Sequence, residues 1–91
     1  MERDERDERS LTACAASPSR RDAGDFLELG RNCMLGRSAP VDLVSAHKWF
    51  NVAAMLGSAE ASRLRREIAA EMSNAEITTA QRAARTWMTL H

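Results

Sequence analysis

The sequence predicts an all-α fold: a helix-turn-helix repeat of the α-solenoid type, with about four antiparallel helices. Three observations support this prediction. Apolar residues recur at i, i+3 and i+4 spacing along most of the chain after its first twenty residues. Small residues stand where two such helices would cross. No segment alternates apolar and polar residues in the way that is typical of a strand.

Composition narrows the class of protein. The 91 residues suffice for one small domain, and 44% of them are hydrophobic. Thirteen basic residues balance thirteen acidic ones, which argues against the basic surface of a nucleic-acid-binding protein. No run of apolar residues is long enough for a signal peptide or a membrane span. Cys14 and Cys33, the two cysteines, form no paired motif. We therefore expect reduced cysteines and a cytoplasmic protein.

The domain boundary is predicted near residue 20. Residues 1–20 repeat an Asp-Glu-Arg theme and then become small and polar around Pro18. Such a segment buries too little apolar area to offset its ordering entropy, so we expect a flexible, disordered N-terminal arm. Residues 21–91 are predicted to form the folded domain.

The first predicted helix begins near Asp22. Asp25 and Glu28 suit its early turns, and Gly36 suits a left-handed C-cap. Gly30 within the helix costs about 1 kcal/mol relative to alanine, so we expect its missing side chain to admit a neighbouring helix. The apolar stripe contains Ala23, Phe26, Leu27, Gly30, Cys33 and Met34.

The second predicted helix begins at the N-cap Asp42 and is closed by Gly57. Ser58 is expected to cap the third helix, and Ser73 with Glu76 forms a capping box that opens the fourth. The expected buried positions of the second helix are Leu43, Ala46, Trp49, Phe50, Ala53 and Leu56 or Gly57. Those of the third are Ala61, Leu64, Ile68 and Met72, and those of the fourth are Ile77, Ala80, Ala84, Trp87 and Met88. The predicted structural core contains Phe26, Leu29, Gly30, Ala46, Trp49, Phe50, Ala53, Leu64, Ile68, Ile77 and Trp87.

A family resemblance rests on one ordered set of residues, namely Leu29-Gly30, Ala46, Trp49-Phe50, Ala53-Ala54 and Gly57. This pattern resembles the Sel-one-like repeat, a relative of the tetratricopeptide repeat. One repeat unit spans about residues 23–61, and the helices of about residues 59–90 look like the capping segment that often ends bacterial chains of this kind. The loop from Gly36 to Val41 lacks one of the glycines that such loops usually carry.

The resemblance implies a non-catalytic scaffold or adaptor that mediates protein–protein interaction. In related arrays the first helix of each pair lines the concave side. By that analogy, the residues expected to bind a partner are Asp25, Glu28, Arg31, Asn32 and Leu35.

Other sites have weaker support. The chain has enough cysteines and histidines for one zinc site, namely Cys14, Cys33, His47 and His91, but their spacing matches no metal-binding motif. Three glutamates resemble solvated helix faces more than paired catalytic acids: Glu67, Glu71 and Glu76. One basic cluster lacks the interleaved aromatic residues of a nucleic-acid surface, and it contains Arg63, Arg65, Arg66, Arg82 and Arg85. We expect no metal, no cofactor and no enzyme activity.

The predicted function is a protein-interaction module whose partner is another protein or peptide, with no nucleic acid or membrane involved. The alternative is a small structural protein that self-associates, as a homo-oligomer, through Trp87 and Met88 at the open end of the stack. A nucleic-acid accessory role is a minor alternative. Trp49, Phe50 and Trp87 suit either core positions or interface anchors.

Overall fold

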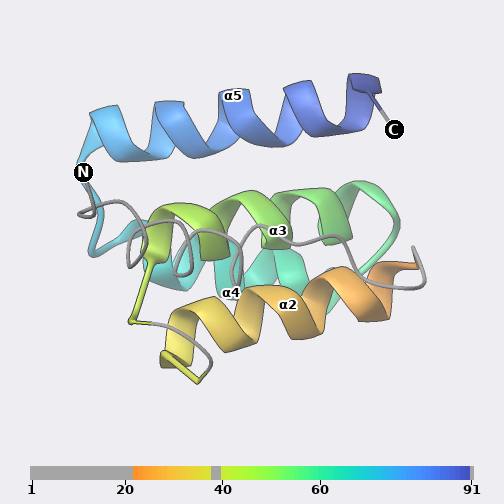
Figure 1. Cartoon of the computed structure of the whole chain (residues 1–91), viewed down its shortest axis with the longest axis horizontal. Coiled ribbons are helices and arrows are strands. Elements are labelled where there is room, and N and C mark those ends of the chain that lie inside the picture. The colour runs from red at the N-terminus through yellow and green to blue at the C-terminus, as the bar shows by residue number, and fades with distance from the viewer. Residues whose placement is uncertain (1–21, 38–39, 91) are drawn as a thin grey trace, which may run out of the picture.

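The computed structural model describes residues 22–37 and 40–90. Within these residues it contains four α-helices and no strand (Figure 1), so the predicted all-α class is confirmed. The helices are α2 (Ala23–Leu35), α3 (Leu43–Met55), α4 (Ala59–Ala69) and α5 (Asn74–Leu90). The predicted arm of residues 1–20, with Cys14, lies outside the described residues, and so does His91.

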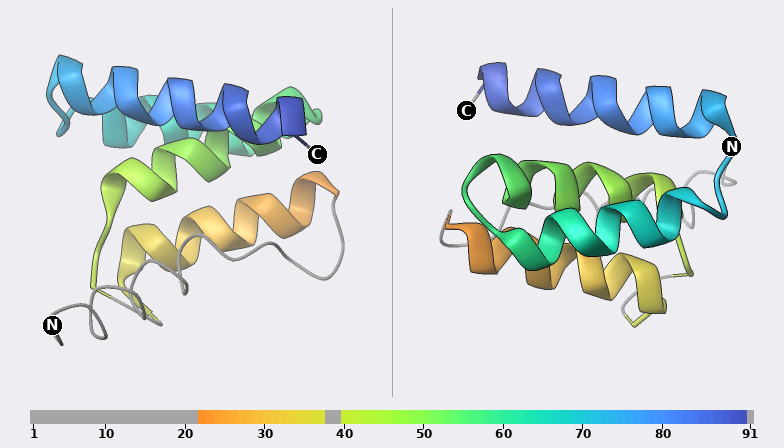
Figure 2. Two further views of the ribbon diagram at one scale, coloured as in Figure 1. Left: turned by 45° about the horizontal axis from the view of Figure 1, so that its top comes forward. Right: turned by 180° about the vertical axis from the view of Figure 1, so that it is seen from behind.

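Helix α3 is the centre of the fold. Each of the other three helices packs mainly against it, and α4 and α5 make little contact with each other. Helices α2 and α4 run opposite to α3, whereas α5 runs in the same direction as α3 (Figures 1 and 2). Consecutive helices are therefore antiparallel, as predicted, but α3 and α5 are parallel neighbours.

The helix starts follow the capping signals of the sequence. Asp42 Oδ1 accepts a hydrogen bond from Ser45 N at 3.0 Å, and Ser58 Oγ accepts one from Ala61 N at 3.0 Å. In the predicted box of α5, Ser73 Oγ accepts from Glu76 N at 3.1 Å. Glu76 Oε1 in turn accepts from Ser73 N at 2.9 Å. These bonds satisfy backbone donors that the first helical turn leaves without partners.

The helix ends also follow the sequence. Gly36 ends α2 with φ of 71°, a left-handed conformation that glycine adopts without steric cost. Gly57 follows α3 with φ of 111°. The placement of Leu56 or Gly57 on the buried stripe of this helix was wrong for both residues, because Gly57 is exposed beyond the end of α3. Leu56 follows the last helical residue and its side chain is 42% exposed.

The core lies around α3. Five of the predicted core residues have no exposed surface: Phe26, Ala46, Trp49, Phe50 and Ala53. Leu64 and Ile68 of α4 are also buried, and Gly30 of α2 is buried against α3. Leu29, Ile77 and Trp87 are instead partly buried and pack against this cluster from α2 and α5. These two helices pack mainly on α3, so their flanking positions remain open to solvent.

Candidate functional site

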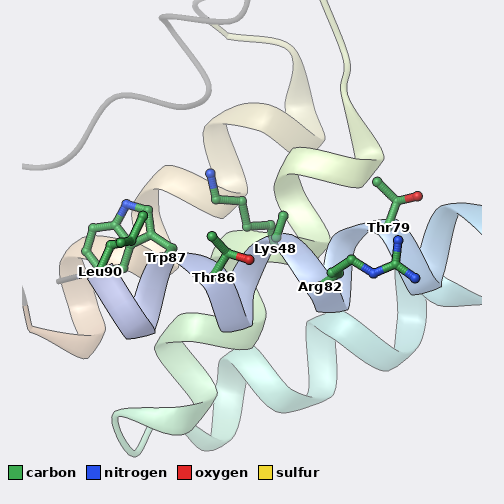
Figure 3. Close-up of a pocket in the computed structure, with 7 residues that line it drawn as sticks. Lys48, Thr79, Arg82, Thr86, Trp87 and Leu90 are labelled. Carbon is green, nitrogen blue, oxygen red and sulfur yellow. The ribbon is translucent and has the colours of Figure 1, made fainter.

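A hollow of about 430 Å³ lies between α3 and α5 (Figure 3). It is lined by Lys48, Thr79, Arg82, Ala83, Thr86, Trp87 and Leu90. Thr79 and Arg82 lie at one end and Trp87 and Leu90 at the other, with Lys48 and Thr86 between them (Figure 3). The hollow therefore has a polar, cationic end and an apolar end, and its volume is in the usual range for ligand sites.

The periodicity of α5 produces this lining. Residues three or four apart lie on the same side of a helix, and Thr79, Arg82, Thr86 and Leu90 follow that spacing. A neighbouring stripe of α5 is formed by the buried alanines at positions 80 and 84, which pack against α3. Small side chains on that stripe bring α5 close to α3, and the longer ones beside it surround the hollow.

Trp87 is held at the apolar end by two other aromatic rings. Its ring centroid lies 5.0 Å from that of Phe26 and 5.5 Å from that of Trp49, with both pairs edge to face. Phe26 and Trp49 stack on each other with centroids 5.5 Å apart. Because both partners are fully buried, the indole of Trp87 is fixed in place, and the part of it that reaches solvent lines the hollow.

Lys48 supplies a cation between the two ends. Its Nζ lies 4.1 Å from the centroid of the Trp49 ring, within the range of a cation–π interaction. Burial lowers the pKa of Lys48, and nearby Cys33 and Asp42 oppose that effect. Since partial desolvation disfavours the charged amine, an anion placed beside Lys48 would stabilise it.

Two arginines extend the cationic surface along α5. A second hollow of about 230 Å³ shares Arg82, Thr86 and Leu90 with the first and adds Arg85 and Thr89. Among the described residues that line the two hollows, none is acidic. After Glu76 the sequence contains no acidic residue at all. Neither arginine forms an ion pair within residues 22–37 and 40–90.

The remaining arginines of the predicted basic cluster have neighbours of their own. Arg63 pairs with Glu67 at 2.9 Å, and Arg65 Nη1 donates to Asn51 Oδ1 at 2.6 Å. Arg66 Nη1 lies 3.5 Å from Ser62 Oγ. The cluster is therefore divided between α4, where three arginines have partners in the helices, and the two hollows along α5.

The partner-binding residues expected on α2 do not line either hollow. Asp25 belongs to the capping box of α2, and Leu35 is 52% exposed. Arg31 forms an ion pair with Glu60 of α4. Arg37 Nη1 lies 3.5 Å from both Glu28 Oε2 and Asn32 Oδ1. Most of the polar groups on this surface thus have partners within the chain.

The weaker candidate sites of the sequence remain separate. Cys33 and His47 are both buried, and the described part of the chain contains no group of three metal-binding side chains. Glu67 pairs with Arg63, and Glu76 belongs to the capping box of α5. Glu71 is exposed after the end of α4.

Sequence reasoning missed the hollow and the burial of His47. One signal for the hollow was present, since threonine and arginine follow the alanine stripe of α5 at helical spacing. The contribution of Lys48 had no such signal, because it depends on how α5 packs beside α3. His47 is 2% exposed, and its residue type gave no signal of this, because histidine is intermediate between the mostly buried and the mostly exposed residue types.

Comparison of the chain with protein-family models, with curated proteins and with solved structures gave no match. No helix in the described ranges is long and apolar enough to cross a membrane.

Proposed function

We propose that this domain is a non-catalytic protein-interaction module of the Sel-one-like type. In this proposal it acts in the cytoplasm without a cofactor and binds a partner polypeptide at the α3–α5 hollow. The observation that carries the proposal is the lining of that hollow. A fixed indole and an exposed leucine stand beside two cations, Lys48 and Arg82, and Arg85 lines the adjoining second hollow. None of the three cations forms an ion pair with a described residue.

The first helix pair supports the resemblance to a repeat. The pattern has a leucine-glycine step in the first helix and an aromatic pair in the second, here Leu29-Gly30 and Trp49-Phe50. Gly30 of α2 lies directly against Phe50 of α3, and the two helices run in opposite directions (Figure 2). A rigid helix pair of this type presents its outer side chains at fixed positions, which suits recognition of a partner.

Photocrosslinking tests whether the domain binds a polypeptide and where. A photoreactive amino acid is placed at Thr86 in the hollow, at Asn32 on α2, or at the exposed Gln81 of α5, which lines neither hollow. The full chain is then irradiated in a lysate of its source cells, and adducts are identified by mass spectrometry. We expect a discrete polypeptide adduct at Thr86 and none at Gln81. The absence of an adduct at every position contradicts an interaction module.

Self-association is a second candidate, and the exposure of α5 favours it. Leu90 is 72% exposed near the end of the helix, beside the partly buried Trp87. A symmetric contact through this face would however bring Arg82 and Arg85 of two copies together, which costs free energy by like-charge repulsion. Light scattering at micromolar concentration separates the two candidates. A monomer supports the module, and a stable dimer supports self-assembly.

A further inference from the structure

We propose that the α3–α5 hollow binds an acidic amphipathic helical segment of a partner protein. In this arrangement one large apolar side chain lies at the Trp87–Leu90 end and carboxylates lie beside Lys48 and Arg82. The inference rests on the proposed interaction function and specifies the chemistry of the partner.

The dimensions of the site favour a helical segment. Thr79 and Leu90 mark the two ends of the hollow on α5. At a rise of about 1.5 Å per residue, eleven positions correspond to roughly 16 Å, the length of about three helical turns. Arg82 lies eight positions before Leu90, or roughly 12 Å along the same axis. An incoming helix with an apolar residue at one position and acids four and seven positions away presents all three on one face.

Charge complementarity determines the sign of the charge that the partner segment should have. The chain has no net charge, yet its cations are unevenly neutralised. Arg31, Arg37 and Arg63 each pair with a glutamate elsewhere on the surface. Lys48, Arg82 and Arg85 form no ion pair within the described ranges. All three cations attract an acidic partner and so favour its binding, while they repel a basic partner.

The apolar end distinguishes a peptide from a polyanion. Nucleic-acid surfaces offer exposed rings on which bases stack, but the ring of Trp87 is packed edge to face on two buried rings. Three cations are also few for binding to a phosphate backbone, where about 6–10 contacts are common. An apolar side chain seated on Trp87 and Leu90, by contrast, follows the usual pattern for a helix bound in a groove.

Peptide binding provides the test. A fluorescein-labelled helical peptide carries one leucine, with glutamates four and seven positions further along. Two matched peptides replace the glutamates with lysine or the leucine with serine. Fluorescence anisotropy with the full chain is expected to give micromolar affinity for the acidic peptide. We expect at least about tenfold weaker binding for each matched peptide, which corresponds to about 1.4 kcal/mol.

Matched variants locate the binding. Arg82→Gln removes one cation from the hollow, and Arg66→Gln removes one from α4. Both arginines are exposed and neither has a carboxylate partner among the described residues, so circular dichroism should show both variants folded. We expect Arg82→Gln to weaken binding of the acidic peptide about fivefold or more, and Arg66→Gln to change it less than twofold.

Several outcomes overturn the inference. Equal binding of the lysine peptide, equal effects of the two arginine variants, or tighter binding to single-stranded DNA or phosphatidylserine vesicles would each do so. Crosslinking of a polypeptide at Asn32 but not at Thr86 leaves the interaction module standing and removes this site. A chain that crosslinks to nothing at any position removes the proposed function itself.

Discussion

Gly30 of α2 lies so close to the ring of Phe50 of α3 that no side chain at position 30 would fit between the two helices. A Cβ atom built on Gly30 would lie 2.5 Å from Cε1 and 2.6 Å from Cδ1 of Phe50. The ring itself has no exposed surface. The missing side chain therefore sets how closely α2 approaches α3, as the position of this glycine within a helix predicts.

Gly30→Ala is expected to destabilise the domain. Alanine gains about 1 kcal/mol of helix propensity over glycine, but overpacking a filled core typically costs about 1–3 kcal/mol. Because Phe50 is buried and has no free side to move into, we expect the cost to exceed the gain, with a net loss of up to about 2 kcal/mol. Urea denaturation followed by circular dichroism measures this change in the free energy of unfolding.

Gly24→Ala is the matched control. A Cβ at Gly24 would meet Asp22 Oδ1 at 3.5 Å, an ordinary contact, at an exposed position in the first turn of α2. We expect unchanged stability or a gain of up to about 1 kcal/mol from helix propensity. If the two glycine variants behave alike, the close approach at Gly30 has no energetic consequence.

Trp49→Ala is expected to be the most damaging aromatic substitution. Trp49 is fully buried and contacts both other rings of the aromatic cluster, Phe26 and Trp87. Truncation of a buried tryptophan costs about 3–5 kcal/mol, a large share of the stability of a small domain. Trp87→Ala should cost less, because this side chain is partly exposed. Thermal melting followed by circular dichroism ranks the two variants. Equal melting points would contradict the assignment of Trp49 as the central core residue of the aromatic cluster.

Ser73→Ala should weaken the start of α5. It removes the acceptor of the bond from Glu76 N and leaves that donor without its cap. Loss of such a cap costs about 1 kcal/mol. Because α5 packs mainly on α3, we expect amide exchange to rise most in the first turn of α5. Thr78→Ala, an exposed substitution in the same helix, should leave exchange unchanged.

His47 is expected to make stability fall below about pH 6.5. Burial lowers the pKa of His47, and the positive charge of Arg65 on α4 adds to that effect. Its Nδ1 has no hydrogen-bond partner within the described residues. With a folded-state pKa below the unfolded value of 6.5, the unfolded chain binds the proton first. Stability is therefore full above that pH and declines as the pH falls towards the folded pKa, by up to about 1.4 kcal/mol per pH unit.

The variant His47→Leu isolates this effect from the titration of carboxylates. Leucine removes the ring and its unpartnered Nδ1, so we expect little loss of stability at pH 7. The free energy of unfolding of the variant should depend less on pH between 7 and 5 than that of the wild type. Parallel curves for the two proteins would show that His47 does not take part.

Local rules were sufficient to predict much of the fold. The capping residues Asp42, Ser58 and Ser73 and the left-handed Gly36 are signals that act over three or four residues. The buried face of α4 likewise follows from one helical period. These features depend on backbone donors and on the 3.6-residue repeat, which the sequence expresses directly.

The candidate site follows different rules. The partner surface that the resemblance implies on α2 stays a prediction, and the structure adds that Arg31 and Glu28 pair with charged residues of the chain itself. The Arg31–Glu60 pair joins α2 to α4 across 29 positions, so helical periodicity contains no information about it. The hollow beside Lys48 and Trp87 also depends on contacts between α3 and α5, because Lys48 lies more than thirty positions before the other residues that line it.

By itself, then, the sequence determined that the described part of this chain forms four helices, where they are capped and which stripe of each is apolar. Only the tertiary structure decided that α5 lies parallel to α3 and that His47 is buried. It also decided that Lys48 and Arg82 border the same hollow. The physical reason is the separation along the sequence of the residues that interact. Caps and stripes arise from bonds within one turn of the chain, whereas a site between helices arises from the packing of segments that the sequence keeps apart.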